Sequence, residues 1–106
     1  MDTIRAGKEI AAFIRELRSQ FSPEQIILFG SRARGDHWKP SDYDFIVVSS
    51  RFAGIHWHDR MVSILKLWSL PEGLDVLPYT PQEFADKRVN SSTVRSAVRE
   101  GKLVVL

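Results

Sequence analysis

Apolar residues recur at helical spacing near the start of the chain, with charged residues on the other faces. The apolar positions are Ile10, Phe13, Ile14, Leu17 and Phe21. This spacing predicts an amphipathic helix over residues 3–20, which ends at Ser22 and Pro23.

Short apolar runs further along the chain predict strands, and helical patterns lie between them. Strands are expected at 25–29, 43–49, 74–79 and 103–106. Helices are expected at 31–35, across 61–68, after a capping box at 80–83, and at 92–100. The alternation of the two patterns indicates an α/β or α+β fold, a small mixed β-sheet flanked by helices. A length of 106 residues suits a single domain spanning 1–106.

Composition narrows the class of protein. Hydrophobic residues make up 43% and charged residues 26%, which is ordinary for a globular domain and argues against disorder. The net charge of +2 permits contact with phosphates but does not require a nucleic-acid substrate. The absence of cysteine excludes disulfides and thiolate zinc sites. No run approaches the ~20 apolar residues of a membrane span, and no signal peptide is visible, so we expect a soluble, cytoplasmic domain.

Two aspartates lie at the start of the strand predicted at 43–49, although the hydrophobic core needs the apolar residues of that strand. Side chains alternate along a strand, so Asp42 and Asp44 project from one face, about two ~3.3 Å rises apart. Two carboxylates at that spacing repel each other unless a cation lies between them, and oxygen ligands of this kind suit Mg²⁺. Asp75 interrupts the apolar strand at 74–79 and is a third acid that could converge on the same point. In the structural alternative, Asp42 caps a turn, Asp44 marks the start of a strand and Asp75 pairs with an arginine. The convergence of the three acids on one point favours a functional site instead.

Gly30 and Ser31 follow the strand at 25–29 and precede a predicted helical turn. Backbone N–H groups in such a place can bind an anion, and glycine lets a phosphate approach the backbone. By itself the pair is more often a plain turn, and the segment is neither a dinucleotide-binding fingerprint nor a Walker A loop. Its value comes from its position shortly before the two aspartates.

Together, the segments GSRARG and SDYDFIVV and the later Asp75 resemble the DNA polymerase β-type nucleotidyltransferase superfamily. More narrowly, they resemble the minimal nucleotidyltransferases, the MNT partners of HEPN proteins. The resemblance extends over the whole chain in the order of its elements. It implies a nucleotidyltransferase fold, with a small mixed sheet flanked by helices.

The resemblance also implies roles for individual residues. Gly30 and Ser31 would hold the triphosphate of ATP. Asp42 and Asp44 would bind magnesium, with two ions expected, and Asp75 would complete the acid set and deprotonate or orient an acceptor hydroxyl. The product would be a nucleoside monophosphate joined to the acceptor, with release of pyrophosphate.

Other residues near the site keep more than one interpretation. Arg34 matches the arginine of the family segment and either contacts phosphate or fixes the loop through a salt bridge. His37, Trp38 and Lys39 are bulkier than the residues that family members often have there, and are candidates for partner contacts. Further on, residues 55–59 contain two histidines and an acid, which we interpret as a solvated helix start. Trp68 is assigned to the core.

Three functions remain open from the sequence. The first is a protein adenylyltransferase that modifies a tyrosine of a helical HEPN toxin and thereby acts as an antitoxin. The second is an antitoxin that neutralises this partner by binding alone. The third is a small-molecule nucleotidyltransferase, which is weakened by the lack of an added helical domain. The presence of all three acids favours the enzyme, and the oligomeric state stays open, with either homo- or hetero-oligomers compatible with the sequence.

Overall fold

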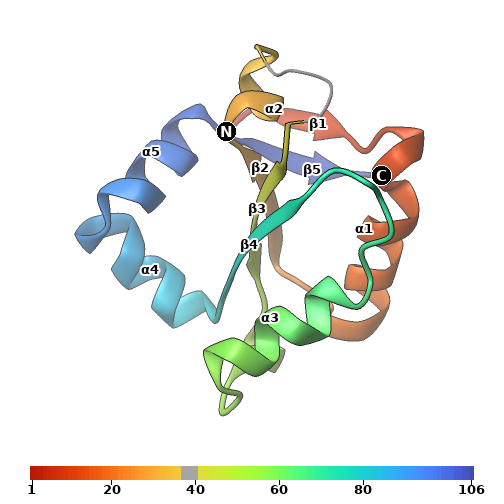
Figure 1. The fold of residues 1–106 in the computed structure, drawn as a ribbon. Helices are drawn as coiled ribbons and strands as arrows, with labels where there is room; N and C mark the ends of the chain where they lie inside the picture. The colour runs from red at the N-terminus through yellow and green to blue at the C-terminus, as the bar shows by residue number, and fades with distance from the viewer. Residues whose placement is uncertain (37–40) are drawn as a thin grey trace.

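The computed structural model describes residues 1–36 and 41–106, which form a five-stranded mixed sheet with helices on both faces (Figure 1). In chain order the elements are β1 (Thr3–Arg5), α1 (Lys8–Phe21), β2 (Gln25–Phe29), α2 (Ser31–Arg34), β3 (Tyr43–Val48), the 3-10 turn η1 (Ser50–Phe52), α3 (Trp57–Leu65), β4 (Leu74–Tyr79), α4 (Pro81–Asn90), α5 (Ser92–Glu100) and β5 (Lys102–Val105). The predicted fold class is confirmed.

The strands lie in the order β1-β5-β2-β3-β4. β2 is antiparallel to both of its neighbours, whereas the outer pairs β1–β5 and β3–β4 are parallel. In this register Phe29 lies opposite Asp44, and Asp44 lies opposite Asp75. The end of β2 and the starts of β3 and β4 therefore meet at the same edge of the sheet.

One face of the sheet packs against α1. The helix contributes its apolar stripe, and Ile64 of α3 joins the same core. The buried residues of α1 are Ile10, Phe13, Ile14, Leu17 and Phe21. Trp68 extends this core, because its ring packs edge-on against Phe13 and Tyr43 and its indole N–H donates to the carbonyl of Glu72. The predicted core position of Trp68 is confirmed.

The opposite face packs against α4 and α5. The buried residues of this second core are Ile27, Ile46, Val48, Tyr79, Phe84, Val94 and Ala97. Alternate residues of β3 enter the two cores, with Phe45 and Val47 toward α1 and Ile46 and Val48 toward α4 and α5. Asp44 therefore lies on the α4–α5 face of a strand that is buried on both sides.

An ion pair between the buried Arg60 and the partly exposed Glu83 joins α3, β4 and α4. Arg60 donates hydrogen bonds to the carbonyls of Ile55 and Pro78 at 2.8 and 3.1 Å, and to Glu83 Oε1 at 2.6 Å. Glu83 also completes the predicted capping box with Thr80, so one carboxylate both starts α4 and anchors α3. The hydrogen bond from Arg60 lowers the pKa of Glu83.

The beginning of the chain corrects the sequence interpretation. The helix predicted over 3–20 begins only at Lys8, because residues 3–5 form β1. β1 runs beside β5, and its flanks are fixed by hydrogen bonds from Leu103 N–H to the Asp2 carbonyl and from Ala6 N–H to the Val105 carbonyl. A three-residue strand is too short to leave a periodic signal. Its pairing partner, β5, lies at the other end of the chain, so no local pattern indicates the pairing.

The second correction concerns α3, which ends at Leu65 although the apolar spacing predicted a helix continuing through Trp68. Residues 66–68 instead form turns closed by hydrogen bonds from Leu67 N–H to the Ile64 carbonyl and from Trp68 N–H to the Leu65 carbonyl.

Within the part of the chain that the structure describes, no helix is both long enough and apolar enough to cross a bilayer.

Candidate functional site

The three acids singled out in the sequence come together at the edge of the sheet where β2 ends. Asp44 is the second residue of β3, and its Cα partner on β4 is Asp75. Paired residues of neighbouring strands face the same side, so both carboxylates lie on the α4–α5 face. Asp42 precedes the strand, next to Gly73. Asp42 and Asp75 are exposed and Asp44 is half-buried, which leaves the group open to solvent on one side.

Burial and the neighbouring carboxylates both disfavour the charged form of Asp44. Burial raises the pKa of this carboxyl above its ordinary value, and the charges of Asp75 and Asp42 raise it further. Arg34 opposes these effects and lowers the pKa. A carboxylate that is partly desolvated and faces two other carboxylates favours a cation among them.

The chemistry of these donors fits Mg²⁺, which takes oxygen ligands and usually retains waters and substrate phosphates around one or two protein carboxylates. In residues 1–36 and 41–106 no group of three or more His, Cys, Asp or Glu side chains is arranged so that it could hold a metal ion. The three carboxylates are therefore close to one another but do not form a complete set of metal ligands by themselves. The site suits an ion whose remaining ligands come from a phosphorylated substrate.

Two glycines make room for the carboxylates. Gly30 has φ +73°, a conformation that favours glycine, and a Cβ there would collide with Asp44 Oδ2. A Cβ at Gly73 would lie 2.5 Å from Asp42 Oδ1. The role of Gly30 as part of the site agrees with its position in the sequence motif. No local pattern in the sequence indicates that Asp42 lies against Gly73.

The predicted phosphate loop lies beside the acids in space. Gly30 is the N-cap of α2, and Ser31 is its first residue, immediately after β2. Since Phe29 lies opposite Asp44, Gly30 and Ser31 lie at the same edge as that carboxylate. A ligand that contacted this loop would reach Asp44 without crossing another element.

Arg34 has a structural role in this state. Its Nε lies 3.2 Å from Asp36 Oδ2 and its Nη1 lies 3.3 Å from Glu100 Oε2. Of the two interpretations left open by the sequence, the salt bridge is the one present, and it joins α2 to the end of α5. The Asp36 and Glu100 partners were not foreseen, since Glu100 is remote in sequence.

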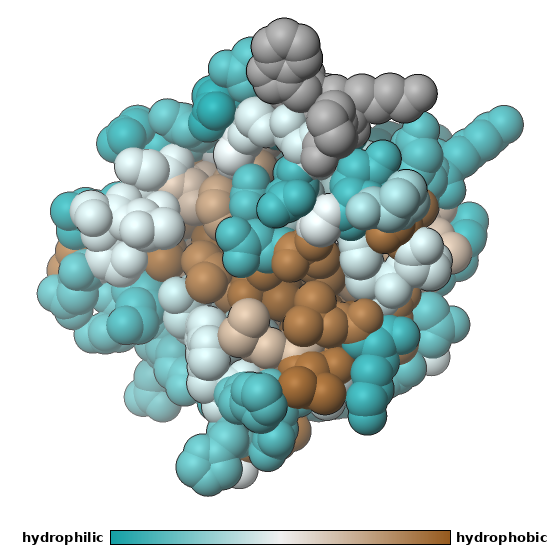
Figure 2. Space-filling view, viewed as in Figure 1, coloured by the Kyte–Doolittle hydropathy of each residue, from teal (hydrophilic) through white to brown (hydrophobic). Residues whose placement is uncertain are grey.

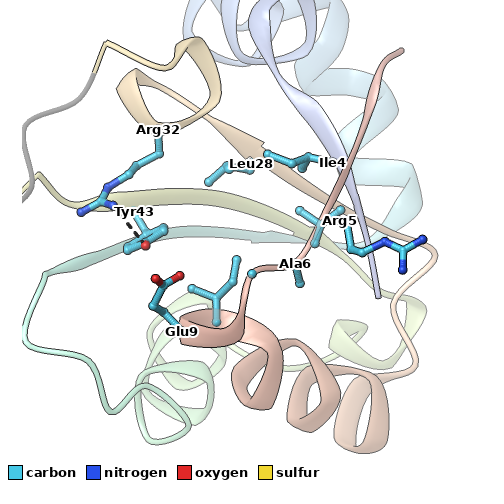
Figure 3. A pocket seen from close by; sticks show the side chains of 10 residues that line it. Ile4, Arg5, Ala6, Glu9, Leu28, Arg32 and Tyr43 are labelled. Carbon is cyan, nitrogen blue, oxygen red and sulfur yellow. Dashed lines mark hydrogen bonds between the residues drawn. The ribbon is translucent and has the colours of Figure 1, made fainter.

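Arg32 fixes the other side of α2. Its guanidinium lies 4.1 Å from the centre of the Tyr43 ring and donates to the Tyr43 hydroxyl at 3.1 Å and to the Ser41 carbonyl at 2.8 Å. Figure 3 shows this pair at one end of a pocket of about 270 Å³ on the α1 face, with Glu9 facing it from α1. Because Tyr43 lies between Asp42 and Asp44, the contact holds α2 against the strand that carries both acids.

The remaining sequence candidates lie apart from the acids or outside the description. His56, His58 and Asp59 are exposed at the start of α3, as expected for a solvated helix start. Trp57 is 40% exposed and its ring contacts Tyr79. The predicted partner contacts His37, Trp38 and Lys39 lie outside the described residues.

Replacing the central carboxylate should stabilise the fold. The pKa of Asp44 is raised in the folded state, so at neutral pH its charge destabilises the protein, and stability increases as the pH falls through that raised pKa. Asp44→Asn removes the charge, and we expect a higher free energy of unfolding in urea, measured at neutral pH with EDTA. Asp2→Asn, at an exposed position, is the control and should have little effect. A clear loss of stability in Asp44→Asn would contradict the repulsion described above.

Comparison with known proteins identifies the family. Residues 10–103 match the family model described as a nucleotidyltransferase domain. The chain is 30% identical over 100 residues to a candidate protein adenylyltransferase of Methanocaldococcus jannaschii, an alignment that covers 92% of this chain and 95% of the relative.

Solved structures agree on the fold. The crystal structure of a candidate nucleotidyltransferase from Sulfolobus solfataricus has a TM-score of 0.61 and 26% identity, over 86% of this chain and 71% of that one. The BolA domain of SufE1 from Arabidopsis thaliana has a TM-score of 0.57 over 74% of this chain and 98% of that domain, but at 20% identity it shares the fold alone. The family match, the archaeal relative and the three acids beside the glycine loop agree, and the chain belongs to the nucleotidyltransferase domain family and is a nucleotidyltransferase.

Proposed function

We propose that this protein is a magnesium-dependent protein adenylyltransferase that transfers AMP from ATP to a tyrosine hydroxyl of a helical HEPN toxin, and thereby acts as an antitoxin. The observation that carries the proposal is the pairing of Asp44 with Asp75, with Asp42 and Gly30 beside them, at an open edge of the sheet. The name of the archaeal relative supports a protein as the acceptor.

The residues of the site have different roles, which follow from their positions. Gly30 and Ser31 hold the triphosphate of ATP, and Asp42 and Asp44 hold magnesium against it. Two Mg²⁺ ions, when bound, would stabilise the charge on the attacking and leaving oxygens of the in-line displacement. Asp75 lies on the edge strand β4, where it can orient the acceptor hydroxyl, accept its proton and contribute an oxygen to the metal.

The bonds made and broken follow from this arrangement. The acceptor oxygen bonds to the α-phosphorus of ATP, and the bond from that phosphorus to the oxygen bridging to the β-phosphate breaks. Pyrophosphate leaves on the side of Gly30, and the proton of the acceptor passes to Asp75 or through it to water. Arg34, which is paired with Asp36 and Glu100, supports the loop that binds the phosphates.

A protein acceptor suits the surface around Asp75. The carboxylates of Asp42 and Asp75 are exposed, so a large acceptor can reach them. Figure 2 shows hydrophobic residues gathered on the face over β4 and the segment before it. Near Asp75 in the sequence, Leu65 is 43% exposed, and Leu67, Leu70, Leu74 and Leu77 are half-buried. Apolar surface of this kind is typically covered by a protein partner.

Coexpression with the candidate HEPN partner tests the proposal. Mass spectrometry should find a gain of one AMP on the partner, located on a tyrosine, with the wild-type protein. The Asp44→Asn variant should form the complex but leave the partner unmodified, since it lacks the central metal ligand. A tight complex without an adduct in either case would replace the proposal by the binding-only antitoxin.

A second variant tests the positioning of Asp42. Gly73→Ala places a methyl group against the Asp42 carboxylate, whose end can move aside, so the fold should persist while the carboxylate is displaced. We expect transfer of AMP to the partner to fall by roughly a hundred-fold, the size of effect that misplacement of a catalytic group produces. Gly7→Ala is the matched control, because its methyl group meets only the end of the Glu9 side chain at 3.1 Å. Equal transfer rates in the two variants, both with wild-type melting temperatures, would contradict a role for Asp42.

A further inference from the structure

A pocket of about 300 Å³ lies at the opposite end of β4 from the acids. It is lined by Trp57 at the start of α3, by Tyr79 at the end of β4, and by Glu83 and Lys87, which lie one turn apart on α4. Tyr79 follows Asp75 by four residues of the same strand, a distance of roughly 13 Å at ~3.3 Å per residue. The pocket is therefore separate from the candidate active site.

A buried tyrosine presents its hydroxyl to this pocket. Tyr79 is only 7% exposed, and its hydroxyl makes no hydrogen bond with a described residue. Within residues 1–36 and 41–106, every side-chain N or O atom that is shut off from solvent has a hydrogen-bond partner. The Tyr79 hydroxyl must therefore reach open space, and the space that Tyr79 lines is the pocket. Burial raises the pKa of Tyr79 and the charge of Glu83 raises it further, so at neutral pH the hydroxyl retains its proton and can donate a hydrogen bond to a ligand.

The charges at the pocket favour an anion. The carboxylate of Glu83 is already engaged: Oε1 accepts hydrogen bonds from Arg60 Nη1 at 2.6 Å and from Thr80 N–H at 2.8 Å, and Oε2 accepts from Arg60 Nη2 at 3.3 Å. Lys87, in contrast, has no carboxylate of a described residue within ion-pair distance. One ammonium and one hydroxyl are thus available as donors, and the oxygens of an anion are the acceptors that suit both.

The remaining wall of the pocket is aromatic. Trp57 is 40% exposed, and the centre of its ring lies 5.2 Å from that of Tyr79, with 45° between the ring planes. The exposed part of the indole can pack against a further planar ring. A volume of about 300 Å³ is at the lower end of the range of small-molecule sites, so the pocket suits a molecule of one or two rings.

We propose that this pocket binds a small aromatic carboxylate, whose ring packs on Trp57 and whose oxygens accept hydrogen bonds from the Tyr79 hydroxyl and the Lys87 ammonium. The ligand contacts α3, β4 and α4, the three elements that the ion pair between Arg60 and Glu83 already joins. The site requires neither the three acids nor ATP, so it is independent of the proposed function.

Three probes that carry different charges on the same indole ring test the site: indoleacetate, tryptophol and tryptamine. Each is titrated at neutral pH into ¹⁵N-labelled protein, and its dissociation constant is taken from the shifts of the Trp57 indole N–H and of the amides of Tyr79 and Lys87. We expect the anion, indoleacetate, to bind roughly ten-fold more tightly than the neutral tryptophol or the cationic tryptamine, because hydrogen bonds to a charged group are the stronger ones.

Substitutions of the lining residues locate the charge preference. Lys87→Met retains an unbranched stem without the charge, and we expect it to weaken indoleacetate roughly ten-fold while leaving tryptophol unchanged. Lys8→Met is the matched control, because Lys8 is also an exposed lysine of a helix but does not line the pocket. Tyr79→Phe removes only the hydroxyl and should weaken indoleacetate, whereas Trp57→Ala should weaken all three probes.

The possible results separate the proposal from its alternatives. Equal binding of the three probes would mean that the pocket recognises apolar surface alone, and tighter binding of tryptamine would mean that Glu83 sets the preference. Either result overturns the proposal, as would the absence of saturable shifts at Trp57 and Tyr79 with millimolar indoleacetate. Selective binding of indoleacetate that Lys87→Met weakens and Lys8→Met does not would support it. The transfer of AMP is measured without these probes, so each claim can fail alone.

Discussion

The arrangement of the site depends on a charge placed in a strand that the core also needs. Residues 45–48 of β3 are buried from both faces, yet Asp44 directly precedes them on the face of Ile46 and Val48. The carboxylate is tolerated because the core beneath α4 and α5 does not extend to this edge of the sheet, where Asp42 and Asp75 are exposed. The pairing of β3 with β4 then brings Asp75 beside Asp44. Burial raises the pKa of Asp44, and the neighbouring charges of Asp75 and Asp42 raise it further.

The loop between β2 and α2 is held from two sides. On the α1 face, Arg32 stacks on Tyr43 and bonds to its hydroxyl, which attaches α2 to the strand that carries the acids. On the other face, Arg34 pairs with Glu100 and attaches α2 to α5. Gly30, at the start of α2, is therefore held beside Asp44.

The sequence predicted those features whose signal is local. Two acids separated by one residue before an apolar run are enough to place Asp42 and Asp44 on one side of a strand, and the capping box at Thr80 marks the start of α4. Asp75 stands out in the sequence as an acid within an apolar run, but its alignment with Asp44 depends on strand pairing that no local pattern encodes.

Features set by distant partners could not be predicted. β1 exists because β5 lies beside it, and the need for glycine at position 73 comes from the carboxylate of Asp42. The amphipathic pattern of residues 92–100 predicted a helix but not that Ser92, Thr93 and Ser96 would face the end of β2. These contacts arise only when the sheet and its helices are assembled.

In the proposed function, Asp42, Asp44 and Asp75 share one metal and nucleotide site at the end of β2. Paramagnetic broadening of amide signals by Mn²⁺, titrated with ATP into ¹⁵N-labelled protein, tests it most directly. We expect the amides of Gly30, Asp44 and Asp75 to broaden first, whereas those of His56 and His58 at the start of α3 stay sharp. Broadening centred on the α3 histidines, or spread evenly over the chain, would contradict it.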